Sequence, residues 1–121
     1  MKRYYRLLLC GAILATVGAG YDDFYGRRLA LGKQAFAEGR AAEAAEELRV
    51  ACFGMLDAPE ALVECTARLA LAQEAAGRKT EAAATVDRFL QLEARFGLFA
   101  KMGLEAPLKA SFQDLVKRLR G

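Results

Sequence analysis

Apolar residues recur along most of this chain at spacings of three and four, the period of helices that bury one face. From residue 21 onward this pattern predicts five helices, at about residues 21–38, 41–55, 59–76, 79–95 and 105–119. Glycines and one Asp-Ala-Pro sequence separate them, as expected at helix ends and starts. No segment alternates apolar and polar residues as a half-buried strand does. The pattern therefore predicts an all-α fold.

The clearest stripe lies in the last predicted helix, which Pro107 opens. Its apolar residues follow the i, i+4, i+7, i+8, i+11 spacing of one helix face: Leu108, Phe112, Leu115, Val116 and Leu119. The polar face carries Gln113 and Asp114 as well as basic residues, which favours a helix that covers a protein core over one that lies on a membrane surface. We therefore expect this helix to cap the helices before it.

One sequence pattern occurs twice. Residues 39–44 and 77–82 both read G-R-x-x-E-A, and each joins two predicted helices, at an offset of 38 residues. Self-similarity at such a period is typical of stacked helical hairpins. A domain over residues 21–121 is therefore expected to contain a first hairpin at about 24–57, a second at 58–96 and the capping helix at 105–119.

The two hairpins resemble tetratricopeptide repeats over about residues 23–96. In the first unit the resemblance lies in Leu31-Gly32, Gly39, Ala44, Leu48 and Ala51. In the second unit it lies in Leu69-Ala70, Gly77, Ala82, Val86 and Phe89. The chain departs from the family in its longer period, in lacking the closing Pro, and in having no aromatic residue at Arg28, Ala35, Thr66 and Gln73.

The resemblance implies two stacked antiparallel hairpins, a right-handed solenoid fragment whose concave face is lined by the first helix of each unit. It implies that a protein or peptide partner binds there, at Leu29, Lys33, Phe36, Arg68, Leu71 and Glu74. The alternative is that Phe36 and Leu71 belong to the core and that the charges are merely solvated. The family's Lys-Asn clamp for a peptide carboxylate is not expected, because the chain contains no Asn.

Close helix crossings are expected where side chains are small. The candidates are Gly32, Ala44, Ala51, Ala70 and Ala82. Large neighbours should fill the gaps beside these crossings: Leu31, Leu48, Leu69 and Val86.

Residues 1–20 have the three parts of a secretory signal: a basic head, an apolar run from Leu7 to Gly18, and small residues before a cleavage point near Ala19. An uncleaved inner-membrane anchor is the alternative. Cys10 is not expected to carry a lipid, because Leu9 precedes it and few apolar residues separate it from the basic head. The segment predicts a periplasmic or secreted bacterial protein.

Cys52 and Cys65 flank the joint between the second and third predicted helices. Export would place these thiols in an oxidising compartment, so a disulfide is a candidate. Their unequal distances from the joint argue against good bonding geometry. The alternative is a pair of buried thiols that pack as small apolar side chains.

Composition restricts the chemistry further. The chain contains no His, which removes the commonest general base and metal ligand, and its cysteines lack zinc-site spacing. From residue 21 onward 15 basic residues balance 15 acidic ones, so no nucleic-acid partner is expected. No cofactor, metal or catalytic residue is predicted.

The sequence therefore predicts a non-catalytic adaptor of the bacterial cell envelope, with membrane contact only through the N-terminal segment. The alternative is a structural subunit of a homo-oligomeric or envelope assembly, in which the apolar connector Gly97–Ala100 would be buried between subunits.

Overall fold

The computed structural model of the protein describes residues 20–120, with side chains from Phe24. Its helices are α2 (Gly20–Ala37), α3 (Ala41–Phe53), α4 (Pro59–Ala75), α5 (Lys79–Phe96) and α6 (Ala106–Arg120). Within this range every regular element is a helix, so the all-α prediction is confirmed there. The predicted signal segment and Cys10 lie outside the described residues.

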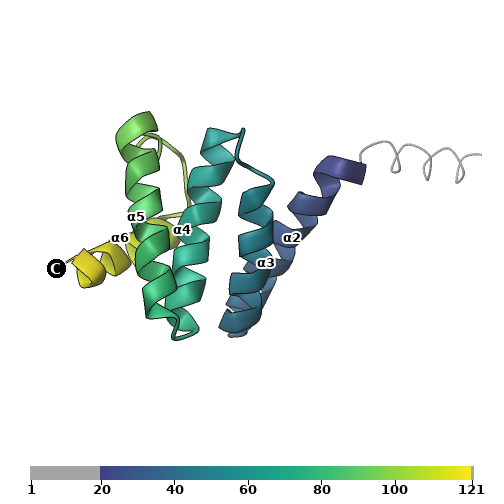
Figure 1. The fold of residues 1–121 in the computed structure, drawn as a ribbon, viewed down its shortest axis with the longest axis horizontal. Helices are drawn as coiled ribbons and strands as arrows, with labels where there is room; N and C mark the ends of the chain where they lie inside the picture. The colour runs from purple at the N-terminus through teal and green to yellow at the C-terminus, as the bar shows by residue number, and fades with distance from the viewer. Residues whose placement is uncertain (1–19, 121) are drawn as a thin grey trace, which may run out of the picture.

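Four helices stand side by side in chain order, each antiparallel to the next (Figure 1). Packing joins α2 to α3, α3 to α4 and α4 to α5. Helix α6 crosses this row at a steep angle and packs on α4. One core cluster lies among α2, α3 and α4, and a second among α4, α5 and α6.

The repeated Gly-Arg pair makes the same helix end twice. Gly39 and Gly77 have φ of 80° and 78°, a left-handed conformation that glycine adopts without cost. The Arg40 N–H donates to the Ala35 carbonyl at 2.8 Å, and the Arg78 N–H donates to the Gln73 carbonyl at 2.9 Å. With the paired bond from each glycine N–H, this is the Schellman arrangement that closes a helix.

The rest of the repeated pattern also has a common role. Arg40 pairs with Glu43, and Arg78 lies 4.0 Å from Glu81, so the first turn of the following helix carries the same Arg–Glu pair in both units. The final alanines of the pattern, Ala44 and Ala82, are fully buried. The pattern thus encodes a helix end, a surface ion pair and a close crossing.

Small residues lie at the helix crossings as expected. Ala51 and Ala70 are fully buried, and a Cβ atom at Gly32 would lie 2.6 Å from Leu48 Cγ. The prediction for Leu31 was wrong, because its side chain is 46% exposed. Gly32 faces α3 at the crossing, and its chain neighbour Leu31 points about 100° away from that direction around the helix.

The connector between α5 and α6 belongs to the core. Phe99 is 8% exposed, and its ring packs edge-on against Phe89 with centroids 5.1 Å apart. Phe112 of α6 adds a third ring, 5.6 Å from Phe99. The Glu93 carboxylate accepts a hydrogen bond from the Phe99 backbone N–H at 2.9 Å. The connector therefore buries Phe99 in its own chain.

Candidate functional site

Four of the six predicted partner-binding residues meet at one point between α2 and α4. They line a cavity of about 30 Å³ together with Leu48 and Leu108, and they are Lys33, Phe36, Arg68 and Leu71. Leu29 packs, partly buried, against the core cluster of α2, α3 and α4. Glu74 lies further along α4, where Arg118 of α6 pairs with it at 2.8 Å.

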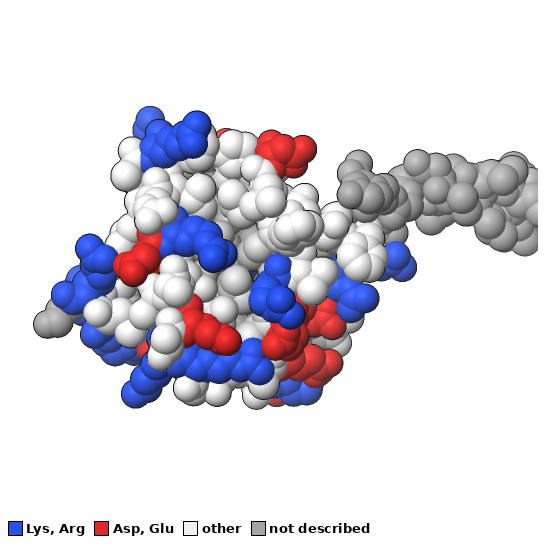
Figure 2. Space-filling view, in the orientation of Figure 1, with Lys and Arg blue, Asp and Glu red and all other residues white. Residues whose placement is uncertain are grey.

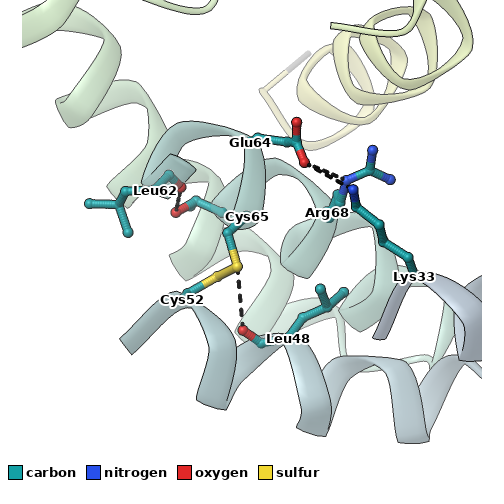
Figure 3. The surroundings of a disulfide bond; sticks show 8 residues. Lys33, Leu48, Cys52, Leu62, Glu64, Cys65 and Arg68 are labelled. Atoms are coloured by element: carbon teal, nitrogen blue, oxygen red, sulfur yellow. Dashed lines mark hydrogen bonds and ion pairs between the residues drawn. A yellow bond between two sulfur atoms is a disulfide. The ribbon is translucent and has the colours of Figure 1, made fainter. Parts of the chain in front are cut away.

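The two basic side chains of this group converge on Glu64 of α4. Lys33 Nζ lies 3.5 Å and Arg68 Nε 3.3 Å from the same Glu64 oxygen (Figure 3). Glu64 and Arg68 are both partly buried, so the three charges form a local network that ties α2 to α4. Sequence reasoning overlooked Glu64, although its i, i+4 spacing to Arg68 was a usable signal.

Helix α6 packs on α4, and one of its residues reaches the cavity between α2 and α4. Leu108 lines the cavity, and Phe112 and Leu115 are fully buried. The remaining space is little more than one water molecule needs. The cavity is therefore nearly filled by the chain itself, and among its lining residues Phe36 is a large apolar one that is exposed.

Phe36 and Leu71 differ in their surroundings. The Phe36 side chain is 41% exposed, so the alternative that it belongs to the core is wrong. Leu71 is half-buried and packs against the cluster of α4, α5 and α6, as that alternative expects. Of the three apolar candidates, Leu29, Phe36 and Leu71, only Phe36 is exposed.

A disulfide joins Cys52 to Cys65, with Cα atoms 5.5 Å apart (Figure 3). Cys65 is fully buried and Cys52 nearly so. The unequal distances of Cys52 and Cys65 from the joint do not prevent the bond, because α4 begins at a point beyond the end of α3. Cys65 lies six residues into α4, about 9 Å along its axis, and the joint at 54–58 spans that offset.

The last residue of α3 and the joint after it carry the most exposed large apolar side chains among the described residues. Phe53 is 70% exposed and Leu56 is 64% exposed. We call this pair the apolar ridge. Sequence reasoning read the segment only as a connection, although two large apolar residues at a turn, outside any helical stripe, were a signal of surface function.

A groove of about 300 Å³ runs beside the apolar ridge, between α3 and α5 over α4. We call it the α3–α5 groove, and its lining residues are Arg49, Cys52, Phe53, Leu56, Leu62, Thr66, Leu69, Arg88 and Leu92. A second hollow, of about 550 Å³, lies on the other side of the ridge and reaches Tyr25 and Asp57. The ridge thus stands between two depressions.

The shifted pKa values of the described residues belong to surface ion pairs near the Gly39 turn and on α3. Hydrogen bonds from Arg49 and Arg78 lower the pKa of Glu46 below its ordinary 4.5. A hydrogen bond from Arg40 lowers the pKa of Glu38 in the same way. These carboxylates are exposed and paired with arginines, so they fix turns and helix contacts. Neither lies in the cavity or the α3–α5 groove.

Buried polar groups in the described range are satisfied within the fold. Thr66 donates to the Leu62 carbonyl at 2.7 Å, and the Thr85 hydroxyl lies 2.6 Å from Gln73 Oε1. Between residues 20 and 120 no group of three or more acidic, Cys or His side chains is arranged to hold a metal ion. The features that the described surface offers for binding are its hollows, its apolar side chains and its charged groups.

Comparison with known proteins found no significant match, either to a family model, to a curated protein or to a solved structure. Among the described helices, none is long and apolar enough to span a bilayer.

Proposed function

We propose that this protein is a non-catalytic adaptor of the bacterial cell envelope, built from two tetratricopeptide-like hairpins and exported by residues 1–20. Support for the repeat comes from the two Gly-Arg helix ends, which share the same backbone geometry and hydrogen bonds 38 residues apart. Support for a binding role comes from exposed apolar side chains on a scaffold of packed helices.

The proposed binding face is the open edge of α2, with Phe36 as its anchor. The single observation that carries this choice is the 41% exposed side chain of Phe36, which lines the small cavity together with Lys33 and the α6 residue Leu108. Aromatic side chains such as that of Phe36 are enriched at protein interfaces, whose rims are polar and can include a residue such as Lys33. The partner is a protein or peptide with an apolar residue and a nearby carboxylate.

Photo-crosslinking tests this face in living cells. Benzoylphenylalanine replaces Phe36 in one variant and Phe96 in the control, because Phe96 is a similarly exposed aromatic (38%) at the far end of α5. A discrete heavier product from position 36, absent from position 96 and weakened by Lys33→Glu, supports the proposal. Equal products from both positions, or none from position 36, would refute it.

The alternative function is a structural subunit, and the support for it comes from another region than the connector Gly97–Ala100. Phe99 is buried within its own chain, so the connector does not offer that ring to a neighbour. The apolar ridge, in contrast, leaves Phe53 and Leu56 largely exposed.

A further inference from the structure

The apolar ridge is displayed on a rigid base. Phe53 directly follows Cys52, whose sulfur is bonded to Cys65 in the buried part of α4. Gly54 is held against the Tyr25 ring, so closely that a Cβ atom there would lie 2.0 Å from Tyr25 Cγ. The backbone of Phe53 is therefore restrained on both sides, which lowers the conformational entropy cost of docking this residue.

The α3–α5 groove beside the ridge has complementary shape and chemistry. Leu62, Leu69 and Leu92 line it, and its volume of about 300 Å³ admits a phenyl ring. Figure 2 shows a largely uncharged area toward the α3–α4 joint, with charged side chains gathered toward the opposite end of the helices. One patch thus carries both a projecting apolar side chain and a hollow that accepts one.

Two opposite charges border this patch. Asp57 directly follows the ridge, and Arg88 lines the groove. Both side chains are exposed, and within residues 24–120 neither has a hydrogen bond or an ion pair. By contrast, Arg49 on the same groove is already engaged by Glu46 at 3.0 Å. Asp57 and Arg88 are therefore available to an external partner.

We infer that a second copy of this chain docks on this patch, with the apolar ridge of each copy in the α3–α5 groove of the other. A patch that contains both a knob and a hole is self-complementary, which is what a twofold interface requires. When Phe53 enters the partner's groove, Asp57 reaches the groove's edge, where the other copy presents Arg88. The twofold axis produces this pair twice. This inference does not depend on the partner-binding face proposed for α2.

The experiment uses two differently tagged full-length copies in one cell, with benzoylphenylalanine at position 53. The expected product has twice the chain mass and carries both tags. The control places the photo-crosslinker at Thr80, an exposed residue at the opposite end of the hairpin. Crosslinked products from position 53 among which none carries both tags would show that the ridge contacts another protein and would overturn the inference, as would the lack of any product.

Charge reversal then tests the geometry of the pair. Asp57→Arg in both copies, or Arg88→Asp in both copies, should weaken association about tenfold, because two ion pairs become repulsive. Mixing one Asp57→Arg copy with one Arg88→Asp copy restores both attractive pairs under twofold symmetry, so the two-tag product should recover. Failure of the mixed pair to recover, or no loss in the single variants, would refute this arrangement. Products from position 36 are scored separately, so this result leaves the adaptor proposal independently testable.

Discussion

The Cys52–Cys65 disulfide is expected to supply a large part of the stability of this small domain. The variant C52A/C65A removes the bond and leaves two alanines at buried helix positions. The closed loop has a sequence separation of 13, for which loop-closure entropy gives about 3 kcal/mol of stabilisation. Folded domains have only about 5–15 kcal/mol in total, so this loss is considerable.

Urea unfolding under two redox conditions measures this effect. Without reductant, the wild type should exceed C52A/C65A by about 3 kcal/mol in unfolding free energy, a shift of roughly 1–3 M in the urea midpoint. With reductant, the two proteins should agree within about 1 kcal/mol, because neither then has the cross-link and only two sulfur atoms distinguish them.

Either of two results would refute this reasoning. If the unfolding curves coincide without reductant, the bond contributes nothing or does not form. If the difference persists unchanged in reductant, the loss comes from packing around Cys65 rather than from the cross-link. If the curves coincide, alkylation of denatured, unreduced protein shows whether the bond forms: free thiols at Cys52 and Cys65 mean that it does not.

Four further substitutions test single positions, and their effects are measured by thermal or urea unfolding. Gly54→Ala should cost about 1–3 kcal/mol, because its Cβ meets the Tyr25 ring. Gly26→Ala has no atom within 4 Å of its Cβ and should gain about 0.5–1 kcal/mol, so equal effects would contradict the packing described. Ala44→Leu should cost about 1–3 kcal/mol by overpacking the crossing. Because the pKa of Glu46 is lowered in the fold, its ionised form stabilises the fold above about pH 4.5, and this contribution is lost as pH falls through the lowered value. Glu46→Gln should therefore lower the unfolding free energy near neutral pH, with a smaller effect in acid and in high salt.

Much of the helical framework was predictable because it depends on local signals. Helix starts at Ala41, Pro59 and Lys79 coincide with their predicted positions, since a glycine or a proline marks each boundary. The buried face of α6 was equally clear from its apolar stripe, because Leu108, Phe112 and Leu115 are all buried. In each case the signal is local: a glycine or proline at a helix boundary, or apolar residues three or four positions apart.

Features that depend on the offset between helices were not predictable. The distance from Cys52 to Cys65 is set by how far α4 begins beyond α3, and residue counting cannot give that offset. Similarly, the apolar stripe shows which side of α6 is buried, but not that Leu108 would line the same cavity as Lys33 and Phe36 of α2. The candidate site was therefore only partly foreseen: its residues on α2 and α4 meet, but the space between them is already occupied.

The disulfide also determines how this chain responds to tension. If the chain is pulled from points on either side of Cys52 and Cys65, the force passes directly through the sulfur bridge from α3 to α4. The segment between the two cysteines then bears no load, and about 40 Å of extended length is withheld from stretching. The apolar ridge lies within that segment, so Phe53 and Leu56 are shielded from any pull transmitted along the backbone.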